Sequence, residues 1–431
     1  MPELDTGSTA WMLMATALVL FMTPGLAFFY GGMVRSKNVL GMLMQNFSAM
    51  GLMGVLWVLV AFSIAFGGDG SLFGNLDHIG FKDVGPEGDG IPFILFAAFQ
   101  MTFAIITPAL ITGATADRFK YSAYMWFIGL WLVLVYAPVA HWVWAAGGWI
   151  FEYGALDFAG GAVVHINAGA AALAAVIVLG ARRGYGKEPM PPHSLPFTVL
   201  GTGILWFGWT GFNAGSALAA DGLAAQALMN TFVAASAALL GWVVVERLKD
   251  GHPTTLGAAS GAVAGLVAIT PCAGFVGTMP AMIIGFVAGG VCFLAIAIKR
   301  AAKLDDSLDV IAVHLVGGLI GSILLGLFAD PAVNGAVSDP GLFIAGGGAA
   351  LLVKQVVASG AVLVFSFVAS FILMKAIDLV IGVRVTPEQE MEGLDSSLHA
   401  EAAYSMGDIA AGLGSVAHAQ TATAHQPAST S

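Results

Sequence analysis

Long apolar stretches alternate with short polar segments along most of the chain. A helix needs about 20 apolar residues to cross the hydrocarbon core of a bilayer, and the pattern offers eleven stretches of about that length. They cover residues 9–32, 40–67, 91–113, 122–143, 159–181, 196–217, 222–246, 254–273, 276–298, 309–329 and 346–380. The pattern therefore predicts an all-α membrane protein with eleven transmembrane helices.

The composition agrees with this prediction and excludes several classes of protein. Of the 431 residues 58% are hydrophobic and 10% are charged, whereas soluble domains carry about 25% charged residues. A soluble protein could not cover so much apolar surface. We therefore exclude a soluble enzyme, a nucleic-acid-binding protein and a disordered scaffold.

Basic residues predict how the helices are oriented. All 16 Lys and Arg residues except Lys82 and Lys354 lie on alternate loops or at the end of the last stretch. Because basic residues favour the cytoplasmic side of a membrane, we expect the N-terminus outside and the C-terminus inside. The expected location is the cytoplasmic membrane.

The hydrophobic pattern also divides the chain into two parts. Residues 1–383 form the expected transmembrane domain, and residues 384–431 form a cytoplasmic tail. We expect disorder from about residue 413, where Ala, Ser, Thr, Gln and His predominate.

Two short segments of the first half recur in the second half. Ala162–Gly169 is similar to Ile311–Gly318, and Ile106–Pro108 is similar to Ile269–Pro271. The repeat predicts two five-helix halves, at about 9–181 and 196–329, followed by a long eleventh helix. Because each half has an odd number of spans, the halves would be inverted, with a substrate path between them.

His165 and His314 occupy equivalent places in the two halves, each inside an apolar stretch. An ionisable group inside a membrane usually faces a cavity or a partner. Two unrelated core histidines are the alternative, but the symmetric placement favours function. Two facing imidazoles could pass a proton or hold a small hydrogen-bonding solute. Asp157 precedes the fifth stretch, where it could cap a helix or stabilise a nearby cation electrostatically.

Other patterns carry weaker indications of chemistry. The segment Gly257–Gly261 resembles the serine motif of intramembrane proteases, with His314 as a possible base for Ser260. However, small residues in membrane helices more often mark close packing, so we favour a transporter over a hydrolase. We expect no catalytic residues, no metal and no cofactor, and we expect Cys272 and Cys292 to be free thiols.

Five blocks, in order along the chain, resemble the ammonium transporter (Amt/Mep/Rh) family, on its bacterial Amt side. They are Phe99–Phe103, Asp157–Ala168, Gly208–Ser216, Asp309–His314 and Glu388–Asp395. The resemblance implies a homotrimer of eleven-helix protomers, each with one narrow hydrophobic pore in the lipid bilayer. It also implies that a PII-type regulator could dock on the cytoplasmic face.

The resemblance assigns expected roles to individual residues. It implies an outer recruitment site for ammonium at Trp144 (rather than Trp142), Phe103 and Ser216, above a gate of Phe103 and Phe212. The pore-lining positions it implies are His165, His314, Trp209 and Thr270. Asp157 matches a buried acid with an electrostatic or structural role.

The expected function is selective, electrogenic uptake of ammonium, with methylammonium as an analogue. Ammonium and potassium are similar in size and charge, so selectivity would come from hydrogen bonding and deprotonation. Cation–π contacts contribute about 0.5–2 kcal/mol, which is far less than the hydration a cation loses in a dry pore. Loss of a proton removes most of that cost, because neutral ammonia crosses apolar surroundings more easily. An ammonium sensor and an electroneutral ammonia channel remain as alternatives.

Overall fold

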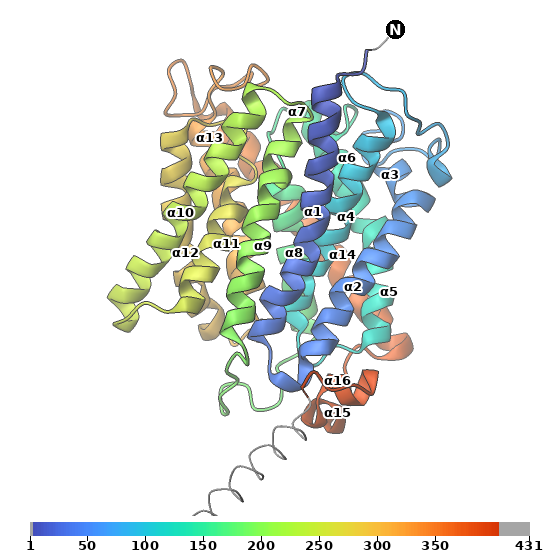
Figure 1. Ribbon diagram of the computed structural model, residues 1–431, viewed down its shortest axis with the longest axis vertical. Coiled ribbons are helices and arrows are strands. Elements are labelled where there is room, and N and C mark those ends of the chain that lie inside the picture. Colours follow the sequence, from blue (N-terminus) through green and yellow to red (C-terminus); the bar gives the residue numbers. More distant parts are fainter. Residues whose placement is uncertain (1–2, 405–431) are drawn as a thin grey trace, which may run out of the picture.

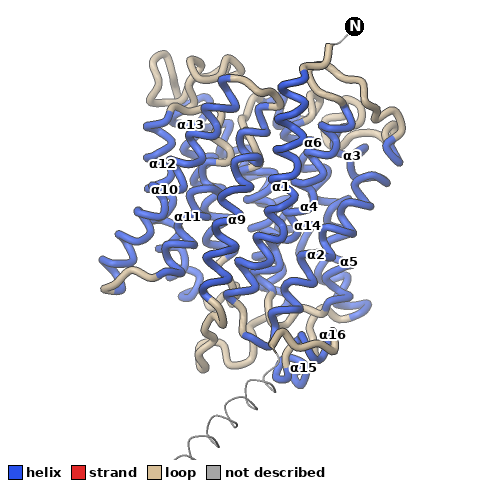
Figure 2. Tube along the Cα trace, viewed as in Figure 1, coloured by secondary structure: helices blue, strands red, loops and turns tan. Residues whose placement is uncertain are grey.

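The computed structural model describes residues 3–404, and every regular element within that range is a helix. The helices form one bundle, with loops gathered at its two ends (Figure 1, Figure 2). We call the end that carries the N-terminus the upper end. The opposite end, which carries the short helices α15 (Pro387–Glu392) and α16 (Leu394–His399), is the lower end.

Nine helical segments within the described residues are long and apolar enough to cross a membrane. They are α1 (Thr6–Met33), α2 (Val39–Leu56) with α3 (Phe62–Phe66), α4 (Phe93–Thr115), α5 (Tyr121–Trp131) with α6 (Ala137–Trp144) and α7 (Trp149–Tyr153), α8 (Asn167–Leu179), α10 (Gly222–Asp250), α12 (Thr278–Ala301), α13 (Gly317–Phe328) and α14 (Ala349–Ile381).

Two further helices occupy the places of the expected sixth and eighth spans. They are α9 (Leu195–Ala214), which packs along α1, and α11 (Thr255–Ile269), which packs against α10 and α12. With 15 residues, α11 is shorter than a usual span. The all-helical membrane fold is thus as predicted, whereas the count of eleven spans and the orientation remain predictions.

Four of the long helical segments contain a π-helical turn, in which the hydrogen-bond spacing widens by one residue. Two lie within continuous helices, at Trp57–Ala61 and Leu132–Tyr136. The other two, Gly161–Ile166 and Ile311–Val316, lead into α8 and α13. Such turns are rare and often mark functional sites, and the second pair contains the two histidines singled out above.

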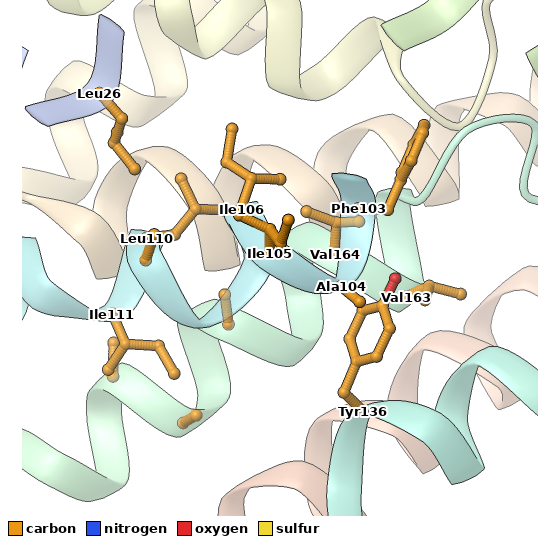
Figure 3. Packing of buried hydrophobic residues seen from close by; sticks show 14 of the residues in the cluster. Leu26, Phe103, Ala104, Ile105, Ile106, Leu110, Ile111, Tyr136, Val163 and Val164 are labelled. Atoms are coloured by element: carbon orange, nitrogen blue, oxygen red, sulfur yellow. The ribbon is translucent and has the colours of Figure 1, made fainter. Parts of the chain in front are cut away.

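The core of the bundle lies around α4, most of whose side chains are buried. Figure 3 shows α4 between Leu26 of α1 and Tyr136 of the fourth expected span, with Val163 and Val164 close by. Its isoleucines and leucines fill this space, so α4 is held on several sides and carries Phe103 in a fixed position.

The tail returns to the lower end of the bundle. Thr386 begins α15 with a capping box, in which its side chain and that of Gln389 each bond to the other's backbone N–H. Asp395 of α16 then accepts a hydrogen bond from Gly41 N of α2 (2.8 Å), and Asn38 Oδ1 accepts one from Leu394 N (2.8 Å). The disorder expected from residue 413 lies outside the described residues.

Candidate functional site

A cavity of about 140 Å³ opens near the upper end of the bundle. Its wall is mostly aromatic and carries no charged side chain. The lining residues are Phe66, Phe96, Phe99, Gln100, Phe103, Trp144, Phe158, Ser216 and Leu218. The volume is enough for a small solute with a few waters, since one water takes about 30 Å³ in the liquid. Aromatic faces attract cations, so the cavity suits a small cation.

The three residues expected at the recruitment site all line this cavity. Trp144 Nε1 donates a hydrogen bond to the Asp157 carbonyl oxygen (3.1 Å), which fixes the indole. The indole stands perpendicular to the Phe103 ring, with ring centres 5.9 Å apart. Trp142 points elsewhere: its Nε1 donates to Leu72 O and its ring packs on Phe365.

Ser216 contributes a hydroxyl whose direction is set by the backbone. It lies in a short 3-10 turn after α9, and its Oγ donates to Phe212 O (2.8 Å). Since the hydroxyl proton is used in this bond, the oxygen lone pairs are left to accept a hydrogen bond from a solute.

Phe103 lines the cavity, and the ring of Phe212 packs against the ring of Phe103. Both side chains are buried, their ring centres lie 4.2 Å apart, and their planes are inclined by 36°. The rings of Phe103, Phe212, Trp209, His165 and His314 follow one another, and we call them the file of rings. The His165 ring lies 6.1 Å from that of Phe212 and 5.5 Å from that of Trp209, nearly parallel to both.

His165 and His314 meet in the middle of the bundle. Their ring centres are 5.3 Å apart, the ring planes differ by 20°, and the two Nδ1 atoms lie 3.3 Å apart. Both residues are almost completely buried, at 1% and 2% exposure. His165 Nε2 has no hydrogen-bond partner among the described residues.

The shared hydrogen bond restricts the protonation of the pair. One Nδ1 must carry the proton that the other accepts, so in the neutral pair the donor ring has a bare Nε2 and the acceptor ring has an Nε2–H. The pair therefore presents one acceptor and one donor at its two outer nitrogens. Such an arrangement can hold a small molecule that both donates and accepts.

Trp209 and Thr270 are joined directly. Trp209 Nε1 donates to Thr270 Oγ1 (3.0 Å), and that hydroxyl donates in turn to Leu266 O (2.8 Å). Thr270 is fully buried, so in this structure it anchors the indole that packs beside His165.

Asp157 binds the start of the helical segment that carries His165. Its Oδ1 accepts from Gly160 N (2.8 Å) and Gly161 N (2.6 Å), and its Oδ2 from Ala162 N (2.7 Å) and Val163 N (3.2 Å). Burial raises the pKa of this carboxyl, and the four N–H groups oppose the rise. These bonds satisfy N–H groups that a helix start leaves free.

Sequence reasoning missed the counterpart of Asp157 in the second half. Asp306 accepts hydrogen bonds from Val310 N (3.1 Å) and Ile311 N (2.8 Å), at the start of the segment that carries His314. Each aspartate precedes its histidine by the same interval along the chain. Unlike Asp157, Asp306 has a cation nearby, with Lys299 Nζ 3.9 Å from its Oδ2.

Glycines allow the two histidine-bearing segments to cross closely. A Cβ added to Gly169 would lie 2.5 Å from Leu315 N, and one added to Gly318 would lie 3.1 Å from His165 Cβ. Both glycines stand one helical turn after a histidine. Because a Cβ at Gly169 would overlap the backbone of Leu315 and one at Gly318 would crowd His165, the two glycines allow the imidazoles to approach each other closely.

The serine considered as a protease nucleophile lies away from this file of rings. Ser260 borders a separate cavity of about 250 Å³ near the lower end, together with Trp242 and Glu246. The hydrogen bond of His314 Nδ1 goes to His165. The geometry thus gives no support to a serine–histidine dyad.

Comparisons with known proteins show the family to which the chain belongs. The sequence profile of the Ammonium Transporter Family matches residues 10–404. The ammonium transporter of Mycobacterium tuberculosis is 50% identical, over 96% of this chain and 92% of its own. The crystal structure of Mep2 from Candida albicans is 34% identical with a TM-score of 0.83, over 90% of this chain and 88% of its own.

A third similarity is to a structure titled Sensor Amt Protein. It is 29% identical with a TM-score of 0.84, over 91% of this chain and 98% of its own. The family consists of membrane transporters and not of enzymes. The chain is a multi-pass membrane protein that belongs to the Ammonium Transporter Family.

Proposed function

We propose that this protein carries ammonium selectively into the cell through the file of rings described above. Ammonium enters the upper cavity, where Trp144, Phe103 and Ser216 hold it. It loses a proton before it passes Phe103 and Phe212, and ammonia then moves along His165 and His314. The observation that carries the proposal is the continuous contact of these rings from the cavity to the histidine pair.

Dehydration explains why deprotonation accompanies passage. Below the cavity the groups that follow one another are the aromatic rings of Phe212 and Trp209 and the two imidazoles. A cation there would lose its hydration without compensation, whereas ammonia can donate to the bare nitrogen of the pair and accept from the other. Potassium has no proton to lose and is excluded.

The test is ammonium-evoked current in proteoliposomes of the purified protein. We expect a saturable current with ammonium, a smaller one with methylammonium and none with potassium. If ammonium evokes no current but turns the liposome interior alkaline, transport is electroneutral and the electrogenic part of the proposal is wrong. An equal potassium current would contradict the selectivity.

The orientation and the assembly belong to the same proposal. We place the upper end outside and the lower end, with the tail, in the cytoplasm. An apolar groove between α10 and α12, of about 600 Å³, supports contact with another copy in a homotrimer. Chemical cross-linking of the protein in native membranes tests the trimer.

A sensor function is the second candidate, and the similarity to Sensor Amt Protein is the observation in its favour. In that case occupancy of the cavity would change the docked tail, and a PII-type regulator or another partner would respond. The same proteoliposomes decide between the two, because a sensor would bind ammonium with little flux.

A further inference from the structure

Gln100 in α4 is a buried amide at the wall of the upper cavity, one helical turn before Phe103. The residue is 9% exposed, and its Oε1 accepts no hydrogen bond from any described residue. Most buried polar side-chain atoms in proteins have a partner. In this position the oxygen is covered by protein, but Gln100 lines the cavity, so a turn of its amide lets the oxygen reach a partner among the solutes there.

The other polar groups of the wall define what that partner is. Ser216 uses its proton on Phe212 O and can only accept. Trp144 uses its Nε1–H on Asp157 O. The remaining lining side chains are apolar or aromatic. A solute that brings several N–H donors thus finds acceptors and π-faces, with no competing charged group on the wall.

We propose that the Gln100 carbonyl oxygen is a second hydrogen-bond acceptor for the recruited cation, acting together with Ser216 Oγ. This inference deepens the proposed function and rests on it, because it takes ammonium as the ligand. The final torsion of a glutamine side chain is broad, so the amide can turn its oxygen into the cavity.

Two acceptors distinguish ammonium from potassium before any proton is lost. Ammonium directs four N–H bonds to the corners of a tetrahedron, and the amide and hydroxyl oxygens take two while the aromatic faces take the others. Potassium is held in selective sites by rings of many carbonyl oxygens. With only two oxygens in the cavity, a dehydrated potassium ion stays under-coordinated.

Gln45 in α2 provides a matched control. It is also a buried glutamine whose Oε1 lacks a partner among the described residues, but it borders none of the described cavities. Replacement by leucine removes a buried amide at either position, and only at Gln100 does it remove an amide from the cavity wall.

The experiment measures the initial ammonium-evoked current against ammonium concentration for Gln100→Leu, Gln45→Leu and the unchanged protein. A hydrogen bond to a charged group is the interaction lost, so we expect the half-saturating concentration to rise about tenfold in Gln100→Leu. The maximal current changes far less, and Gln45→Leu leaves the half-saturating concentration unchanged. An unchanged value in Gln100→Leu overturns the proposal.

The variant Gln100→Glu tests whether the side chain of residue 100 acts as a hydrogen-bond acceptor or as a donor. A carboxyl keeps the oxygen but has no amide N–H, so this variant retains a half-saturating concentration near that of the unchanged protein, or lower. If Gln100→Glu is as weak as Gln100→Leu, the acceptor role is wrong.

A direct measurement of ammonium binding distinguishes failure of this proposal from failure of the proposed function. Ammonium is titrated calorimetrically into each purified variant, with choline chloride as the ionic control. Suppose that the unchanged protein gives no current but binds ammonium tightly, and that Gln100→Leu weakens this binding. The acceptor role of Gln100 is then supported, and the proposal of ammonium transport is wrong. If the unchanged protein neither conducts nor binds ammonium, both proposals fail.

Discussion

At the scale of single residues, the histidine pair gives the most direct prediction for transport. Removing either ring takes away the Nδ1 partner of the other, which is then left buried and unpaired. We expect His165→Ala and His314→Ala each to lower ammonium current at least several-fold or to admit potassium. His252→Ala, in the exposed loop between α10 and α11, is the control. Unchanged current and selectivity in both pair variants would contradict the mechanism.

Asp157 gives a prediction for stability. Asp157→Ala leaves four backbone N–H groups without their acceptor, so we expect a loss of several kcal/mol in the free energy of unfolding, because each buried donor left unsatisfied costs about 1–3 kcal/mol. Asp221→Ala removes a single capping bond from α10 and should cost about 1 kcal/mol. Thermal unfolding in detergent compares them. An equal decrease in melting temperature would show that the four bonds act no more strongly than one.

The sequence predicted some of these residues for a physical reason and missed others for one. A histidine in an apolar stretch is costly, so His165 and His314 were conspicuous. Asp306 stands beside Asp305 and Asp309 in a polar loop, where one more acid is unremarkable. The interval that Asp306 shares with Asp157 was the available signal. Gln100 gave no such signal, because a single amide side chain in an apolar helix usually packs in the protein interior.

At the scale of elements, the glycine contact between the two histidine-bearing segments can be tested. In Gly169→Ala the added methyl group would meet the backbone at Leu315, so the segments must move apart. Overpacking of this kind costs about 1–3 kcal/mol, and we expect a clear loss of ammonium current.

Gly360→Ala in α14 is the control for that prediction, because a Cβ there meets nothing within 4 Å. It should raise the melting temperature or leave it unchanged, since alanine favours helices over glycine. If Gly169→Ala conducts as well as Gly360→Ala, close approach of the segments is unnecessary for conduction.

The hydrophobic pattern predicts where the helices lie, but it does not predict their internal geometry. Apolar stretches located the helices because a bilayer demands them. They could not predict the π-helical turns at Gly161–Ile166 and Ile311–Val316, because the spacing of backbone hydrogen bonds leaves no mark on hydropathy. Nor could they predict that α11 is short: its C-terminal part gives way to a turn at Thr270.

At the scale of the whole molecule, the docked tail ties the end of the described chain to its beginning. Asp395 accepts from the first turn of α2, and Asn38 accepts from the first residue of α16. Asp395→Ala should therefore speed amide hydrogen exchange both in α16 and at the start of α2. Glu392→Ala, exposed on α15, is the control. Faster exchange in α16 alone would show that α2 does not depend on this contact.

The crossing at Gly169 and Gly318 also bears on how the protein is made. The two histidines are 149 residues apart along the chain. At about 5–20 residues per second, the ribosome needs roughly 7–30 s to pass from the first to the second. During that interval the fifth span has no partner for its imidazole, and a nascent chain that stalls there exposes a polar ring to lipid. We expect membrane quality-control proteases to act on such chains.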